Sequence, residues 1–406
     1  MALTPENFLL IVSILLFSSI VAGRAGSRFG VPALLLFLGV GMFFGTNGVV
    51  ESDFVSPYMA QFIGVVALSI ILFSGGLDTK YEEIRPVLWQ GLILSSLGVI
   101  LTALFTGLII YFITNIYSSR LSLSFVESML LASIISSTDS ASVFSILRSK
   151  GVTLKNNLRP LLELESGSND PAAFMLTTIF LKMALAGEVS LSYFLINLVT
   201  QFSIGALLGY LLAKAVIFFI GKFTLENRSL YHILLLATLF FIYSITHRLG
   251  GNGFLAVYLA GLIIGNHKNL CDQSVFTFFD GIAWLSQLIL FLTLGLLVNP
   301  MSLTSFDVVT IGVFVSLAMI VISRPFSVFI SLIPFRGMDI NTKHYISWVG
   351  LKGAVPIVFA TYPLIAGLES AELMFNIVFF ITLVSLLVQG TTVNIVAKWM
   401  GLHENG

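Results

Sequence analysis

The sequence predicts an all-α polytopic membrane protein, and three observations support this fold class. Of the 406 residues, 57% are hydrophobic and only 10% are charged, and the mean hydropathy is +1.00. Globular proteins carry about 25% charged residues, so most of this chain is predicted to lie in lipid. Apolar stretches long enough to cross a bilayer recur along the chain, and Lys and Arg concentrate in alternate loops.

Taking about 20 apolar residues as one crossing predicts thirteen transmembrane helices. They fall roughly at residues 7–23, 31–50, 59–77, 86–115, 125–147, 160–186, 192–221, 230–247, 253–266, 280–298, 305–332, 345–368 and 372–399. The first segment is expected to be a true helix and not a cleaved signal peptide. Glu6 precedes it in place of lysines, and Arg24 and Arg28 follow it.

Two of the predicted helices have an interrupted apolar pattern. The fifth contains the polar run Ser-Ser-Thr-Asp-Ser-Ala-Ser at 136–142, and the twelfth contains Lys-Gly-Ala-Val-Pro at 352–356. The two interruptions lie seven helices apart, and paired broken helices are typical of transporters built from inverted repeats with a site near the midplane. We therefore predict inverted repeats with two broken crossing helices, the fifth and the twelfth.

The basic residues predict the orientation of the chain in the membrane. An odd number of crossings places the termini on opposite sides, and cytoplasmic loops carry the excess of Lys and Arg. Alternating the loops leaves Arg120 and Arg248 on one side and fourteen basic residues on the other: Arg24, Arg28, Lys80, Arg85, Arg148, Lys150, Lys155, Arg159, Lys222, Arg228, Lys268, Arg336, Lys343 and Lys398. We expect the N-terminus outside the cell and the C-terminus in the cytoplasm.

The rest of the composition predicts one membrane domain without cofactors. No low-complexity linker divides the chain, so we take residues 1–406 as a single membrane transport domain. The formal charge is zero and no basic run occurs, which gives no support to nucleic-acid binding. The single cysteine, Cys271, excludes an intrachain disulfide and a cysteine-rich metal cluster.

Ionisable residues within apolar segments are costly and mark functional or paired groups. Five such residues are Asp139, Glu165, Asp170, Arg324 and Lys352. The sixth helix carries the sequence Glu-Ser-Gly-Ser-Asn-Asp at 165–170, and spacings of three to five residues place these oxygens on neighbouring faces about one turn apart. Their side chains can converge on one site.

An alkali cation prefers oxygen ligands, and it must exchange its hydration shell for carboxylate, hydroxyl and carbonyl groups without being held too tightly. Where the fifth helix breaks, the carbonyls near Ser137 and Thr138 lose their helical partners. We therefore predict a monovalent cation at Asp170, the exchanged charge, helped by Asp139, Ser166 and the Thr138 carbonyl.

Structural roles compete with these functional ones. Asp139 is equally well interpreted as an N-cap for the second half of the fifth helix, and Ser166 as packing between helices. Asn169 is expected to bridge the broken helices through its amide.

The remaining charges are expected to support the site. Glu165 and Arg324 are expected to form a buried ion pair. Lys352 is expected to neutralise carbonyl dipoles at a helix interruption, and a Schiff-base role lacks any accompanying cofactor motif.

At these residues the chain resembles the NhaP-type cation/proton antiporters, the first cation-proton antiporter family, and within it the potassium/proton branch. The matching motifs are Thr138-Asp139, the 165–170 sequence, Ser-Arg-Pro at 323–325 and Gly-Leu-Lys-Gly-Ala-Val-Pro at 350–356. They follow in order over nearly the whole chain. One departure is Lys352, where the family usually has Arg, a planar and permanently charged group.

The resemblance implies several further properties. It implies electroneutral exchange marked by the Asn169–Asp170 pair, and pairing of Glu165 with Arg324. It implies a homodimer in the cell (inner) membrane, with dimerisation and core subdomains intermixed along the chain. Any cytoplasmic regulatory tail would lie beyond residue 406.

The predicted activity is the exchange of a monovalent alkali cation, potassium favoured, for a proton. Asp170 binds one or the other, and the carrier crosses only when that charge is neutralised. A sodium/proton antiporter of the same mechanism is the alternative. A cation channel, and an intramembrane aspartyl protease using Asp139 and Asp170, are the rivals from other classes. The Gly-x-Gly-Asp pattern expected of such a protease is absent from the sequence around Asp170.

Overall fold

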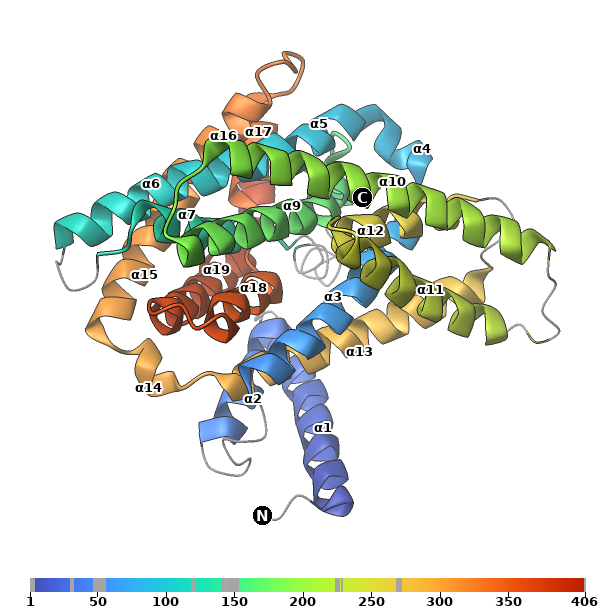
Figure 1. The fold of residues 1–406 in the computed structure, drawn as a ribbon, viewed down its shortest axis with the longest axis horizontal. Helices are drawn as coiled ribbons and strands as arrows, with labels where there is room; N and C mark the ends of the chain where they lie inside the picture. The colour runs from blue at the N-terminus through green and yellow to red at the C-terminus, as the bar shows by residue number, and fades with distance from the viewer. Residues whose placement is uncertain are drawn as a thin grey trace.

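The computed structural model describes residues 4–29, 33–46, 56–117, 122–139, 143, 153–222, 227, 229–267 and 272–404, and these are almost entirely helical (Figure 1). In the first half of the chain the elements are α1 (Pro5–Phe29), α2 (Ala33–Thr46), α3 (Pro57–Asp78), α4 (Tyr81–Ile84), η2 (Arg85–Val87), α5 (Leu88–Ile93), η3 (Leu94–Gly98), α6 (Val99–Tyr117), α7 (Phe125–Ile134), β1 (Thr153–Leu154) and α9 (Leu158–Ala186).

The second half of the chain contains both long and short helices and ends in a short strand. Its elements are α10 (Leu191–Lys222), α11 (Ser229–Arg248), α12 (Gly253–Gly265), α13 (Gln273–Leu297), α14 (Pro300–Leu303), α15 (Phe306–Ala318), η4 (Met319–Ser323), α16 (Arg324–Ser331), α17 (Ile340–Trp348), α18 (Ala354–Ile365), α19 (Ala371–Trp399) and β2 (His403–Glu404).

The apolar character of these helices is that of a multi-pass membrane protein. Within the described residues, 8 helices are long and apolar enough to cross a membrane, and α2, α7, α12 and α18 are shorter apolar helices. Each of the thirteen segments expected from the sequence contains helix. The all-α membrane fold class is confirmed, while the number of crossings and the orientation of the termini stay predictions.

Two boundaries differ from expectation. The fourth helical segment begins at Tyr81 and not at 86, and passes through the short 3₁₀ turn η2, which holds Pro86. A proline ring removes one backbone donor and fits a first helical turn, so Pro86 is accommodated in this 3₁₀ turn within the segment, where a start was expected. The twelfth segment begins at Ile340 and not at 345.

The helices pack in two groups that meet around α9 and α18. Helices α1, α2, α3 and α10 to α13 contact one another, as do α5, α6, α7, α9 and α15 to α19. Across the boundary, α9 contacts α3, α10 and α12, and α18 contacts α3 and α13. Figure 1 shows α1 projecting from the first group at one end of the molecule.

Two π-helical turns, η3 and η4, interrupt the fourth and eleventh helical segments. Such turns free backbone carbonyls and are frequent at functional sites. Here the Ser327 hydroxyl donates to the Gly98 carbonyl, and the Thr102 hydroxyl donates to Ser327 at 2.9 Å. The first irregular turn is thus joined to α16, the helix that directly follows the second, and the two turns lie seven segments apart, as the two interrupted helices do. The inverted repeat itself stays a prediction.

A small antiparallel ladder ties the end of the chain to the start of α9. Thr153 and Leu154 of β1 pair with Glu404 and His403 of β2. After Lys155, Asn156 and Asn157 have φ of 61° and 51°. Asn tolerates this left-handed backbone better than most residues, so the chain can turn sharply into α9.

Candidate functional site

The fifth segment loses its helix at the residues that the sequence singled out. Helix α7 begins with a capping box of Ser124 and Glu127 and ends at Ile134, so residues 135–139 are not helical. Ser136 donates its hydroxyl to the Ser133 carbonyl at 2.7 Å, a local bond that competes with helix continuation. Residues 140–142 and 144–147 lie outside the described residues, and with them the expected second half of this helix and the proposed N-cap role of Asp139.

The twelfth segment is interrupted between α17 and α18, at residues 349–353. Lys352, with 1% exposure, extends its ammonium group to the end of α7 and donates to the carbonyls of Ser136 at 3.3 Å and Ser137 at 2.8 Å. The carbonyls at a helix C-terminus carry partial negative charge and lack helical donors. The lysine therefore lies against the carbonyl dipoles at the end of an interrupted helix, and its supporting role stays a prediction.

The two interruptions are also joined through their backbones. The Asp139 N–H donates to the Leu351 carbonyl at 2.7 Å. A Cβ added at Gly353 would lie 2.1 Å from Oδ2 of Asp139, so only glycine leaves room for that carboxylate. The two non-helical segments thus cross in direct contact.

Asp170 lies on α9 facing this crossing point, and its side chain is buried. The Ser137 hydroxyl donates a hydrogen bond to Oδ1 of Asp170. Pro171 follows directly and has no N–H, which removes one helical hydrogen bond beside the acid. Pro171 also accepts a hydrogen bond at its carbonyl from the Asn252 amide at 2.7 Å, which connects α12 to α9.

Ser166 and Asn169 attach α9 to Thr138. The Ser166 hydroxyl donates to the Thr138 carbonyl at 2.8 Å, and the Asn169 amide donates to the Thr138 hydroxyl and, at 3.4 Å, to the same carbonyl. The geometry is that of a bridge between α9 and the end of α7. The carbonyl that the sequence offered as a cation ligand already accepts these donors.

Glu165 and Arg324 form an ion pair inside the second group of helices. Their residue exposures are 1% and 3%, so neither charge is solvated by bulk water. Arg324 begins α16 directly after the π turn η4, and Gly350 lies against its side chain. Neither charged residue lines the cavity described next, so the pair lies behind the cavity wall.

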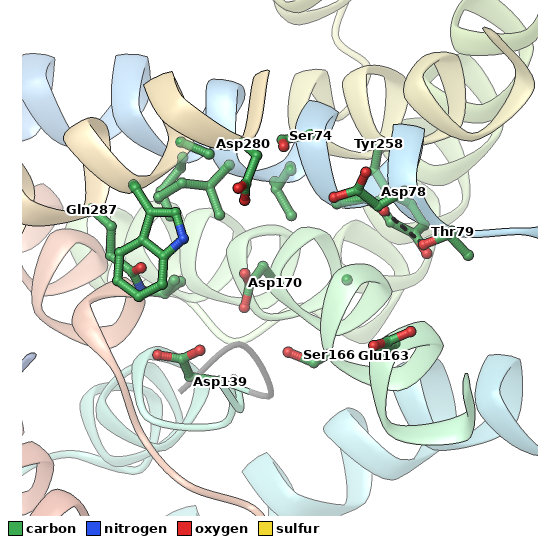
Figure 2. Close-up of a pocket in the computed structure, with 18 of the residues that line it drawn as sticks. Ser74, Asp78, Thr79, Asp139, Glu163, Ser166, Asp170, Tyr258, Asp280 and Gln287 are labelled. Atoms are coloured by element: carbon green, nitrogen blue, oxygen red, sulfur yellow. Dashed lines mark hydrogen bonds between the residues drawn. The ribbon is translucent and has the colours of Figure 1, made fainter. Parts of the chain in front are cut away.

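A cavity of about 550 Å³ leads to Asp170. Figure 2 shows Asp139, Ser166 and Asp170 around the same space, with α3 and α13 on the opposite wall. Thr138, Asn169, Glu165, Arg324 and Lys352 lie behind the wall, since the cavity lining does not include them. The structure thus brings all eight predicted residues together, and three of the eight line the cavity.

Further acids that the sequence did not single out line this cavity: Asp78 on α3, Glu163 on α9 and Asp280 on α13. Each stands at or near the end of a predicted span, where a charge is ordinarily read as solvated. Glu163 offered a signal, because it is seven residues from Asp170 and so lies on the same face of α9. No sequence signal marked Asp78 and Asp280, because only the packing of the helices brings them to the cavity.

Aromatic side chains fill the space on the other side of Asp170. Phe174, one turn beyond the acid, contacts Phe254 of α12 and Phe359 and Tyr362 of α18, with ring centroids 5.0 to 5.5 Å apart. Tyr243 of α11 contacts Phe254 as well. None of these rings lines the cavity, so the described residues give the acid an open side and a side packed with rings.

Comparison with known proteins agrees with this arrangement. A family model described as "Sodium/hydrogen exchanger, transmembrane" matches residues 11–399. The chain belongs to this exchanger family. The family is one of transporters, so the prediction that the chain is not an enzyme, and the suspected resemblance to cation/proton antiporters, are confirmed.

Individual exchangers are similar to the chain over nearly its whole length. The K(+)/H(+) antiporter NhaP of Alkalimonas amylolytica is 40% identical over 396 residues, and the K(+)/H(+) antiporter NhaP2 of Shewanella sp. (strain ANA-3) is 37% identical over 402. In both cases the match covers 97% of this chain and 67% of the relative.

A solved structure has the same fold. The sodium proton antiporter MjNhaP1 of Methanocaldococcus jannaschii has a TM-score of 0.81 at 21% identity, with 97% of this chain and 99% of that chain covered.

Proposed function

We propose that this exchanger carries potassium, or less favourably sodium, in exchange for a proton, and that both ions compete for Asp170. The observation that supports this most is the buried carboxylate at the inner end of an acid-lined cavity. Asp139 and Ser166 face the same space and supply further oxygens. The 37–40% identical relatives named K(+)/H(+) antiporters favour potassium.

The geometry supports alternating access. The cavity gives ions a route to Asp170 from the side of Lys80, Glu83 and Arg159, which the distribution of basic residues assigns to the cytoplasm. The aromatic rings around Phe174 close the other side. We therefore infer that the structure is an inward-open state. Opening the other side would require α9 and α18 to move relative to α11 and α12.

Competition for one carboxylate accounts for coupling. Either loaded form carries the same local charge, because Asn169 adds no second titratable group. Moving a bare charge against the membrane potential costs about 2.3 kcal/mol per 100 mV, so only the neutralised carrier is expected to cross. One cation then exchanges for one proton, and the cycle is electroneutral.

We infer that the chain resides in the cell membrane as a homodimer, with its N-terminus outside and its C-terminus in the cytoplasm. Large apolar side chains on α1, among them Leu9, Phe17 and Ile20, are 61–70% exposed in the single chain. Such side chains suit lipid or a second copy. The helix group of α1 to α3 and α10 to α13 is the proposed dimerisation subdomain, and the group that contains Asp170 is the proposed core.

A channel is the second candidate from another class. It needs a continuous pore, whereas the rings around Phe174 fill one side of Asp170. An aspartyl protease would use the two acids that share the cavity, but membership of an exchanger family argues against it.

The test is dissipation of an imposed pH gradient by the full chain in proteoliposomes, with potassium and sodium salts in turn. We expect dissipation with potassium at lower concentrations than with sodium, and no net transport driven by an imposed potential. Cation flux that does not depend on the pH gradient would contradict exchange and indicate a channel. Cleavage of a peptide reporter without ion flux would contradict exchange and indicate a protease.

A further inference from the structure

Two buried polar residues of α19, Ser385 and Gln389, lie one helical turn apart and each is 1% exposed. Burying polar side chains in a membrane protein is costly unless they are hydrogen-bonded. Both are bonded here: Ser385 to the non-helical segment 349–353, Gln389 to the last residue of α17, and the two to each other.

The three hydrogen bonds are donated in one direction, from Lys352 to the end of α17. Gln389 donates its amide to the Trp348 carbonyl at 2.8 Å, which would otherwise lack a donor at the end of the helix. Its Oε1 accepts the Ser385 hydroxyl at 2.5 Å, and the Ser385 oxygen accepts the Lys352 N–H at 2.8 Å. Two side chains thus satisfy backbone groups at both ends of the interruption.

Other hydroxyls of the same helix behave differently. Thr382, Thr391 and Thr392 donate to carbonyls of α19 itself, at 2.6 to 2.9 Å. This is the usual bond of a hydroxyl within a helix. Ser385 instead donates its hydroxyl to the Gln389 side chain and accepts the Lys352 N–H of the crossing segment.

We propose that Ser385 and Gln389 are positioning residues for the cation site. They fix the backbone of Lys352, whose ammonium group holds the Ser137 carbonyl at 2.8 Å, and the Ser137 hydroxyl in turn holds Asp170. The orientation of the transport acid is therefore set from α19, through four hydrogen bonds. This inference rests on the proposed function of Asp170.

The test compares Ser385→Ala with Thr382→Val in proteoliposomes. Thr382 is fully buried one turn earlier, and its replacement removes a hydroxyl that bonds only within the helix. We expect Ser385→Ala to raise the potassium concentration for half-maximal exchange by about threefold or more, since one hydrogen bond changes an equilibrium constant by about 2 to 12-fold. Thr382→Val and Ser385→Thr should stay near wild type.

The pH profile of exchange is the second readout. The charges that interact with Lys352 and Asp170 here are Arg324, Glu165 and Asp139. All of them remain in the variants, so a displaced profile would report the changed position of Lys352. Gln389→Met should displace it in the same direction, and the double variant should exceed neither single variant by much, because both act through one chain of bonds.

The outcomes separate this inference from the function on which it rests. Loss of exchange in the wild type would defeat the proposed function. An active wild type with unchanged apparent affinity and pH profile in both Ser385→Ala and Gln389→Met would overturn the positioning role. The same shift in Thr382→Val would overturn it too. If Ser385→Ala fails to fold, the Gln389→Met and Ser385→Thr pair decides.

Discussion

Ser137 contacts a charge on each side: its hydroxyl donates to the Asp170 carboxylate, and its carbonyl accepts from the Lys352 ammonium group at 2.8 Å. An acid on α9 and a base between α17 and α18 are thus connected through one residue of an interrupted helix. Because Ser137 is hydrogen-bonded to both charged groups, a displacement of either one is expected to change the position of the other.

The buried pair of Glu165 and Arg324 should contribute to stability only as a pair. Removing one partner leaves a buried charge without compensation and is expected to cost about 3–5 kcal/mol. We expect Glu165→Gln and Arg324→Met each to lower the temperature of thermal unfolding in detergent markedly. The double variant should lose less than the sum of the two. Additive losses would mean that the two side chains do not depend on each other.

Gly353 should resist substitution because of the Asp139 carboxylate. A Cβ there lies 2.1 Å from Oδ2, so the acid or the crossing segment must shift in Gly353→Ala. We expect exchange to fall by about tenfold or more, since misplacing a binding group by about 1 Å can cost 100-fold. Gly281→Ala on α13 is the control, because nothing lies within 4 Å of its Cβ. Equal rates in both variants would contradict the close contact.

Phe174 should act as part of the barrier on the closed side. Phe174→Ala is expected to destabilise the fold by about 3–5 kcal/mol and to leave a cavity beside Asp170. We expect the pH gradient across proteoliposomes to leak without added cation. Phe279→Ala removes another buried ring, which contacts Phe73 and not the rings around Phe174, and should destabilise without leak. A tight membrane with Phe174→Ala would place the barrier elsewhere.

Much of the site could be predicted because charges in lipid need partners. That cost alone indicated the Glu165–Arg324 pair and the approach of Lys352 to the carbonyls of an interrupted helix. Helical spacing brought Ser166, Asn169 and Asp170 together on α9. These arguments need only the local sequence and the free-energy cost of placing a charge in lipid.

Other features could not be predicted, since they depend on how helices pack. The hydroxyl that reaches Asp170 belongs to Ser137, but helical periodicity says nothing of direction where the chain is not helical. The acids Asp78 and Asp280 line the cavity only because α3 and α13 cross opposite α9. The Ser385–Gln389 connection on α19 joins residues that are more than 30 positions from Lys352 and its neighbours, and no local pattern marks it.

The most direct test of the account is Asp170→Asn in potassium-loaded proteoliposomes under an imposed pH gradient. Asn keeps the size of the side chain but cannot hold a cation or release a proton, so exchange should vanish. Asp280→Asn, which removes an acid from the same cavity, should retain exchange. Wild-type rates with Asp170→Asn would contradict the claim that one carboxylate carries both ions.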